Sequence, residues 1–160
     1  QSILKIVTPQ NLVYAKSCRP LDVLVFTNGC IRMLHPGHVV FLEQASALGD
    51  VLVVAVNSDA SCKRLKGSVL IPFRDRVLMI AALACVDYVV KMDDDTPHSL
   101  LRALHPDVLV KSDSSPYPVG HEIVESYGGR VVVLPAYGGY STTQLIDRLL
   151  ADVAIDFNPG

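Results

Sequence analysis

Two histidines flank a Pro-Gly step within the stretch from Phe26 to Ala45, where an apolar run is followed by a helix-like pattern. His35 and His38 are separated by Pro36 and Gly37, and proline is favoured at the first position of a helix. The free N–H groups and the dipole at the start of a helix favour an anion. Imidazoles placed there can donate hydrogen bonds to phosphoryl oxygens as negative charge develops. The stretch therefore predicts a phosphate site with two catalytic histidines.

Plainer interpretations of these side chains exist. Each histidine taken alone could be a helix-end residue that the backbone satisfies. Cys30, His35 and His38 could be three ligands of a zinc ion, although a fourth ligand is absent from the pattern. The run Asp93 to Asp95 could bind a metal, but acidic residues also complement the dipole of a following helix, here one expected to be capped by Thr96. The residue types alone leave these alternatives open.

The elements that position the histidines follow from apolar runs rich in valine and leucine. The runs are mostly continuous, which is typical of strands buried on both faces of a parallel sheet. They cover Val23 to Thr27, Val51 to Asn57, Tyr88 to Lys91, Val108 to Lys111 and Arg130 to Leu134. Helical patterns lie between them, so right-handed crossovers predict a doubly wound, Rossmann-like α/β domain of about five parallel strands. Ligands of such folds bind at the carboxyl ends of the strands, where the histidine loop would lie.

Length and composition set the class of protein. The chain has 160 residues, with 14 basic and 16 acidic side chains and a net charge of −2. We expect one domain over 21–153, an extension or short helix over 1–20, and a tail or linker over 154–160. The absence of a basic block argues against nucleic-acid binding through phosphate contacts. No apolar stretch reaches the ~18 residues of a membrane span, and four scattered cysteines without a targeting segment predict a cytoplasmic protein.

Several motifs together resemble the nucleotidyltransferase superfamily with the H-x-G-H signature, which includes glycerol-3-phosphate cytidylyltransferase and the nucleotidyltransferase domain of ADP-heptose synthase. The segment "NGCIRMLHPGH" matches the signature, and "LGDVLVVAVNSDAS", "RLKG", "RDRVLMIAAL", "VDYVV", "PDVLVK" and "GGYSTT" follow in the family's order. The resemblance covers Phe26 to Leu150. It implies transfer of a nucleoside monophosphate from a nucleoside triphosphate to a phosphorylated acceptor, with release of pyrophosphate. Mg²⁺ would arrive on the triphosphate, and an anionic acceptor oxygen would need no general base.

The resemblance also implies roles for individual residues. The catalytic group would be His35, His38, Lys66 and Arg76, with Arg76 bridging phosphates or bracing the site. The nucleotide would be bound by Thr27, Asn28, Gly29, Gly37, Ser141, Thr142 and Thr143. Ser141 also has capping-box spacing to Gln144, so a helix cap and a phosphate contact can coexist there. Lys66, Arg76 and Lys111 each have a plainer interpretation as surface cations.

Two positions depart from the heptose branch. Arg32 stands where that branch and the glycerol-phosphate branch have an aspartate. After the lysine the heptose branch has two glycines, an aspartate and an aromatic residue, whereas Lys111 is followed by Ser-Asp-Ser-Ser-Pro, without the two glycines. Arg32 could point to solvent. If it faces the site, Arg32 and Lys111 would together clamp a small acceptor with exposed negative charge.

These departures resemble the cytidylyltransferase domains of fosfomycin biosynthesis. The first expectation is therefore CTP as donor and 2-hydroxyethylphosphonate, or another small phosphonate or phosphate, as acceptor. One alternative is an adenylyltransferase of the ADP-heptose type that uses ATP and heptose-1-phosphate, and another is a non-catalytic nucleotide-binding regulatory module. We also expect a homodimer, and a second catalytic domain fused after residue 160.

Overall fold

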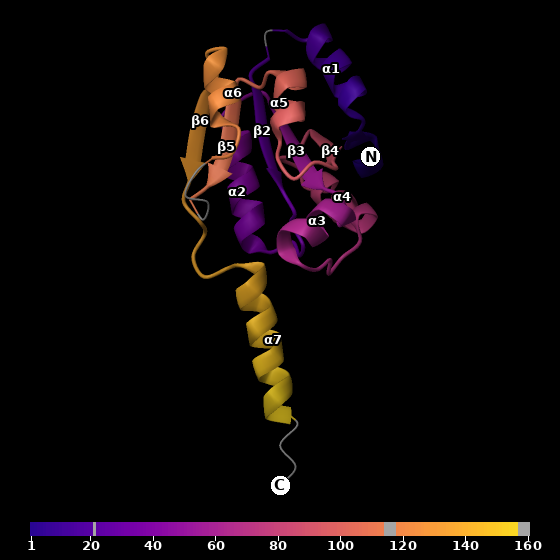
Figure 1. The fold of residues 1–160 in the computed structure, drawn as a ribbon, viewed down its shortest axis with the longest axis vertical. Coiled ribbons are helices and arrows are strands. Elements are labelled where there is room, and N and C mark those ends of the chain that lie inside the picture. Colours follow the sequence, from indigo (N-terminus) through magenta and orange to yellow (C-terminus); the bar gives the residue numbers. More distant parts are fainter. Residues whose placement is uncertain (21, 114–117, 157–160) are drawn as a thin grey trace.

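The computed structural model describes residues 1–20, 22–113 and 118–156 (Figure 1). Its centre is a 6-stranded, all-parallel sheet with the order β1-β4-β3-β2-β5-β6. The strands are β1 Ile6–Val7, β2 Leu24–Gly29, β3 Val51–Asn57, β4 Tyr88–Met92, β5 Val108–Ser112 and β6 Arg130–Leu134. The predicted Rossmann-like α/β fold is confirmed, with the two-residue edge strand β1 added to the five strands expected.

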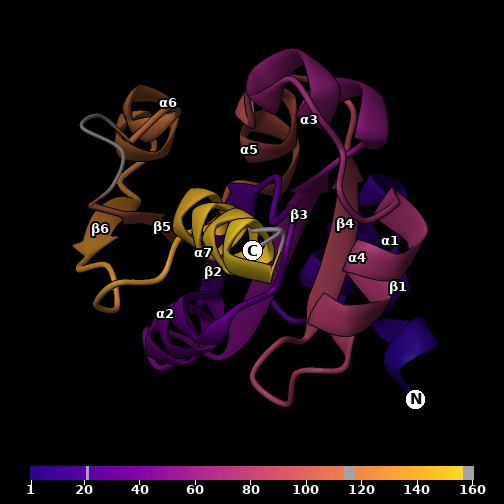
Figure 2. The same ribbon diagram turned by 90° about the horizontal axis from the view of Figure 1, so that it is seen from below.

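Helices cover both faces of the sheet, which explains why its strands are apolar throughout. The helical elements are η1 Ser2–Lys5, α1 Pro9–Cys18, α2 Pro36–Ser46, α3 Asp59–Lys66, α4 Phe73–Ala81, α5 His98–Leu104, α6 His121–Ser126 and α7 Thr142–Asp156. One core cluster joins the sheet to α2 and α4, through Leu42 and Ile80 among others. The second joins its other face to α1, α5 and α6, through Leu12 and Leu101 among others. Figure 2 shows α2 and α4 on one side of the sheet and α1, α5 and α6 on the other.

The order of the strands creates the position for a ligand. From β2 the chain proceeds through α2 to β3 and β4 on one side, and α5 then returns it to β5 on the other side of β2. The topological switch point therefore lies between β2 and β5, whose register pairs Phe26 with Leu109. In doubly wound sheets the crevice at the carboxyl ends of such a strand pair binds the ligand.

The first 20 residues form part of this fold. Strand β1 pairs with β4 in the register Ile6 to Val89, Leu12 of α1 is buried, and the Lys16 ammonium donates to the carbonyl of Leu104 at 2.8 Å. At the other end, α7 extends away from the sheet (Figure 1) and runs to Asp156, three residues into the span expected as a tail. The rest of that expected tail, 157–160, lies outside the described residues.

The acidic run before α5 is engaged in contacts within the protein. The Asp93 carboxylate pairs with Lys91 at 3.0 Å, and the Asp95 carboxylate pairs with Arg64 at 2.7 Å. The predicted Thr96 cap is wrong: α5 begins at His98 with Pro97 in the capping position and no side-chain cap.

The described ranges contain neither a metal-binding cluster nor a membrane-spanning helix. Across these ranges, no group of three or more histidine, cysteine or acidic residues is arranged to hold a metal ion, so neither the zinc site nor the aspartate metal site is supported. No helix in the same ranges is both long and apolar enough to span a membrane.

Candidate active site

A cavity of about 510 Å³ opens at the carboxyl ends of β2 and β5, which is the size range of small-molecule sites. Figure 2, viewed from below, shows the start of α7 lying over this end of the sheet. The cavity collects almost all of the predicted site residues from separate parts of the chain. They are Thr27, Asn28, Gly29, Arg32, His35, Gly37, His38, Lys66, Lys111, Ser141, Thr142 and Thr143. Arg76 is the exception among the predicted residues.

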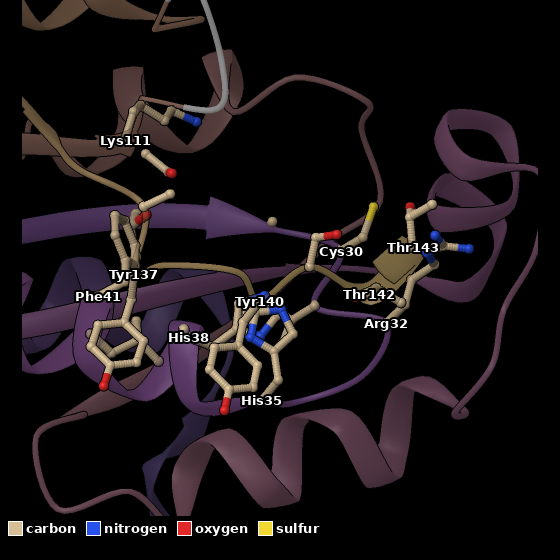
Figure 3. A pocket seen from close by; sticks show the side chains of 18 of the residues that line it. Cys30, Arg32, His35, His38, Phe41, Lys111, Tyr137, Tyr140, Thr142 and Thr143 are labelled. Atoms are coloured by element: carbon tan, nitrogen blue, oxygen red, sulfur yellow. The ribbon is translucent and has the colours of Figure 1, made fainter. Parts of the chain in front are cut away.

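The two histidines occupy the start of α2 as predicted. His35 is the N-cap residue, Pro36 takes the first helical position, and the His38 N–H donates to the His35 carbonyl at 2.9 Å. Their rings stack with centroids 3.8 Å apart (Figure 3). The Nδ1 atom of each ring is shielded from solvent and has no hydrogen-bond partner among the described residues. His35 also makes no side-chain cap, so the helix-end interpretation does not account for this pair.

The surroundings of both imidazoles favour their neutral form in the free protein. Burial lowers the pKa of His35 below its ordinary value. Burial, with a smaller contribution from neighbouring His35, lowers the pKa of His38 to about 4. A neutral imidazole has one N–H donor, and an anion placed against it favours the donating and protonated forms. The pair is therefore suited to respond to charge that appears in the pocket.

Gly37 permits close packing around the pair. A Cβ built there would lie 3.0 Å from two atoms of the His35 ring and 3.4 Å from Cβ of Tyr140. Any larger residue would push against the ring or against the loop that precedes α7. The glycine thus lets the histidine loop and the later segment approach each other.

Positive charge surrounds the histidines without a carboxylate. The described lining contains Arg32, Lys66 and Lys111 but neither aspartate nor glutamate. Arg32 faces the pocket and donates through Nη1 to the Ser68 hydroxyl at 3.0 Å. The Lys111 ammonium donates to the side-chain oxygen of Asn28, and burial lowers the pKa of Lys111 to about 8. Such a lining favours a ligand that carries several negative charges.

Arg32 and Lys111 do not share one end of the cavity. Figure 3 shows them on opposite sides of the histidine pair, with Thr142 and Thr143 on the side of Arg32. This separation does not favour the expectation that both cations clamp one small acceptor, which stays a prediction. Each cation faces a different part of whatever fills the pocket.

The start of α7 supplies backbone donors to the same cavity. The Ser141 hydroxyl accepts from the Gln144 N–H at 3.1 Å, which is the predicted cap. The first N–H groups of a helix have no partner within the helix. Thr142 and Thr143, at the first positions of this 15-residue helix, line the cavity.

Arg76 lies behind the cavity, where its side chain is fully enclosed. It donates to the carbonyls of Ile71 at 2.9 Å and Cys30 at 2.5 Å, and its Nη2 pairs with the Asp59 carboxylate at 2.7 Å. The residue after Cys30 is Ile31, whose φ of 42° is a strained value for a β-branched side chain. Of the two expected roles, bridging phosphates finds no support in this position, whereas the contacts suit bracing of the histidine loop.

Two tyrosines in the lining were not among the predicted site residues. Tyr137 and Tyr140 come from the loop between β6 and α7 and reach the cavity beside His35. The only signal in the sequence was the pattern "YGGY" directly before the matched "STT" block. Aromatic side chains in a loop are as often surface features, so the pattern alone did not select them.

The fold and the cavity define an α/β protein with a pocket at the start of a helix, lined by two histidines and three cations. Comparison with known proteins gives the family. The cytidylyltransferase-like family model matches residues 26–148, and the chain belongs to this family of nucleotidyltransferases.

The curated relatives are named as two-function proteins. The chain is 52% identical over 131 residues to the "Bifunctional protein HldE" of Syntrophotalea carbinolica, covering 79% of this chain and 27% of that protein. It is 48% identical over 135 residues to the protein of the same name from Hahella chejuensis, covering 82% of this chain and 28% of that protein. The chain thus spans about a quarter of the length of these relatives.

Two solved structures share the fold. One is a lipopolysaccharide core biosynthesis protein from Thermoplasma volcanium, with a TM-score of 0.61, 23% identity and coverage of 72% of this chain and 97% of that one. The other is a pantoate-beta-alanine ligase from Francisella tularensis, with a TM-score of 0.59, 12% identity and coverage of 81% and 66%. At these identities the similarity supports the fold alone.

Proposed function

We propose that the protein transfers a nucleoside monophosphate from a nucleoside triphosphate to a phosphorylated acceptor and releases pyrophosphate. The observation that carries the proposal is the stacked pair of neutral imidazoles, each with a shielded and unpartnered nitrogen, in a described lining that holds three cations and no carboxylate. Charge builds on the α-phosphoryl oxygens during such a transfer, and preorganised donors stabilise it there. A module that only binds nucleotides has no need of this pair.

The positions of the cations suit an in-line displacement. Attacking and leaving oxygens lie on opposite sides of the phosphorus, and Arg32 and Lys111 lie on opposite sides of the histidine pair (Figure 3). We assign the leaving pyrophosphate to Arg32, Lys66 and the first turn of α7, where helix N–H groups favour an anion. We assign the anionic acceptor to Lys111. An oxygen of the acceptor attacks the α-phosphorus. The bond between the α-phosphorus and the pyrophosphate oxygen breaks, and its electron pair leaves with pyrophosphate.

Magnesium fits this assignment as a companion of the triphosphate. Mg²⁺ prefers oxygen ligands and keeps several of its waters, and the described lining offers it hydroxyls and carbonyls but no carboxylate. We therefore propose that the ion is held mainly by the phosphates of the substrate, where it neutralises their charge. Arg32 and Lys66 then share that charge with the ion.

The relatives favour ATP and a sugar phosphate as the substrates. The relatives described above are bifunctional HldE proteins, which belong to the ADP-heptose branch, and nothing in the comparisons supports the phosphonate acceptor or fosfomycin biosynthesis. The first expectation of CTP and hydroxyethylphosphonate is therefore replaced by its alternative, an adenylyltransferase of the ADP-heptose type. A second catalytic domain in the full-length protein remains part of this proposal.

The test is a matrix of donors and acceptors. ATP and CTP are each incubated with heptose-1-phosphate, glycerol-3-phosphate and 2-hydroxyethylphosphonate in the presence of Mg²⁺, and pyrophosphate is followed. We expect turnover with ATP and heptose-1-phosphate. Turnover only with CTP and the phosphonate would restore the replaced expectation, and no pyrophosphate in any combination would contradict transferase activity.

Arg32→Ala tests whether this arginine binds the pyrophosphate part of the donor or the acceptor. Because Arg32 is assigned to the pyrophosphate side, the variant should raise the KM for the nucleoside triphosphate about tenfold while the KM for the acceptor stays unchanged. Steady-state kinetics with each substrate varied in turn gives both values. A rise in the acceptor KM alone would return Arg32 to the acceptor.

Lys111 makes acceptor use dependent on pH. Burial lowers the pKa of Lys111 from its ordinary value of 10.5 to about 8, so the ammonium is charged well below pH 8 and loses its charge as the pH rises through that value. We expect kcat/KM for the acceptor to fall above pH 8, by up to about tenfold per pH unit. Lys111→Arg stays charged and should remove this fall. The same fall in the arginine variant would assign it to another group.

A further inference from the structure

Four rings form a continuous row along one wall of the cavity. The rings of His38 and His35 are followed by Tyr140, whose centroid lies 6.3 Å from that of His35 with an interplanar angle of 24°. Tyr137 continues the row with a centroid 6.1 Å from that of Tyr140 and an angle of 11°. Figure 3 shows the row running from the histidine pair toward Tyr137. The phosphate site and the two tyrosines therefore belong to one surface.

The tyrosine rings are held in place but remain open to a ligand. Tyr137 is 50% exposed and Tyr140 is 38% exposed, which is high for large aromatic side chains. Between them Gly139 has a φ of 76°, a conformation that glycine adopts readily and that turns the chain back so the rings face the same way. The Ala136 N–H donates to the Asp113 carboxylate at 2.9 Å and ties the loop to the segment after β5. Close packing of Tyr140 on Gly37 fixes the other end of the loop.

We propose that Tyr137 and Tyr140 are the stacking platform for the nucleobase of the donor nucleotide. This inference rests on the proposed function and adds the subsite for the base. In a nucleotide one ribose separates the α-phosphate from the base. If the α-phosphate lies at His35 and His38, the base must therefore lie about the length of one ribose away, along a wall of the cavity. Flat aromatic faces lie on the wall that holds both tyrosines and, near Tyr137, Phe41, whereas Arg32 lies on the opposite side of the histidine pair. Offset stacking on such faces is favourable.

The platform fixes the position of the base more than its identity. Every nucleobase has a π-face, and aromatic stacking is tolerant of the base stacked. We therefore expect loss of a ring to weaken ATP and CTP alike. The choice between them is left to polar contacts at the edge of the base.

The test compares ligands with and without a base. ATP, CTP and inorganic tripolyphosphate are titrated calorimetrically, with Mg²⁺ present, into the protein and into Tyr137→Leu, which removes the ring but keeps an apolar side chain. We expect the variant to bind both nucleotides about tenfold or more weakly and tripolyphosphate with unchanged affinity. Tyr137→Phe, which keeps the ring, should bind all three ligands like the parent. Tyr14→Leu is the matched control, because Tyr14 is 72% exposed on α1 and outside the cavity.

Two results would overturn the platform. Unchanged nucleotide affinity in Tyr137→Leu would mean that the base lies elsewhere. Equal weakening of nucleotides and tripolyphosphate would mean that the ring only positions the loop. Failure of the proposed function is distinguishable, since it would appear as absent pyrophosphate release while the difference between nucleotide and tripolyphosphate affinity persists.

Discussion

His38→Ala is expected to lower kcat about 10²- to 10³-fold while the dissociation constant for the nucleoside triphosphate changes by less than about threefold. Burial holds the pKa of His38 at about 4 in the free protein, so the ring is uncharged before the reaction and attracts the ground-state phosphate only weakly. Its hydrogen bond strengthens as charge grows on the α-phosphoryl oxygens. The loss therefore falls on the transition state. Pre-steady-state measurement of pyrophosphate formation, with binding measured in the absence of acceptor, separates the two quantities.

The outcome against this assignment is a parallel loss of binding and turnover. In that case His38 would be a binding or structural group, and the shielded nitrogens would have another explanation. A thermal unfolding curve shows whether the variant has simply lost its fold. We expect it to stay folded, because the His38 side chain is only partly enclosed. His35→Ala in the same assays shows whether the stacked rings act as one unit.

Arg76→Leu should give the largest loss of stability, about 2–4 kcal/mol in the free energy of unfolding, because it leaves the carbonyls of Cys30 and Ile71 enclosed without a donor. For a chain of this length that corresponds to a fall in Tm of about 5–15 °C. The variant should also lose turnover at temperatures where it is folded. The reason is that the hydrogen bond from Arg76 to the Cys30 carbonyl holds the strained turn at Ile31 in place. Denaturant titration and activity below the transition measure the two effects separately.

Asp59→Asn is the matched control for this variant. It keeps a side-chain acceptor for Arg76 and leaves both carbonyl contacts intact, so its cost in the free energy of unfolding should be clearly smaller than that of Arg76→Leu. Equal destabilisation by both variants would show that the ion pair, rather than the carbonyl contacts, holds the loop. Full activity of a folded Arg76→Leu would contradict the bracing role.

The fold could be predicted because its strands are apolar on both faces and separated by helical patterns. All five expected runs are strands in the structure. β1 was not predicted because two residues, Ile6 and Val7, carry no periodicity; only pairing with β4 makes them a strand. The Thr96 cap failed for a related reason, since short helices start where packing and proline geometry place them.

The lining of the site was also largely predictable. Parallel strands end at one edge, so loops that follow different strands meet there, and the motifs of those loops name most of the lining. The enclosure of Arg76 was not predictable, because arginine is rarely fully buried and no local pattern distinguishes a buried one from a surface one. The separation of Arg32 from Lys111 likewise depends on the width of the cavity, which no spacing in the sequence encodes. The tyrosine row depends on ring orientations set by Gly37 and Gly139.

Because the described lining of the cavity holds three cations and no carboxylate, the net charge of the protein is a poor guide to how it attracts an anionic ligand. The chain carries a net charge of −2, which by itself would repel a triphosphate. A concave, low-dielectric wall concentrates the field of the charges nearest to it, and here those are Arg32, Lys66 and Lys111. An approaching anion is therefore repelled by the net charge of the protein but attracted by the cations at the entrance of the cavity. Dissolved salt screens the distant exterior charges within about 10 Å, so the short-range attraction at the mouth governs how substrate is captured from solution.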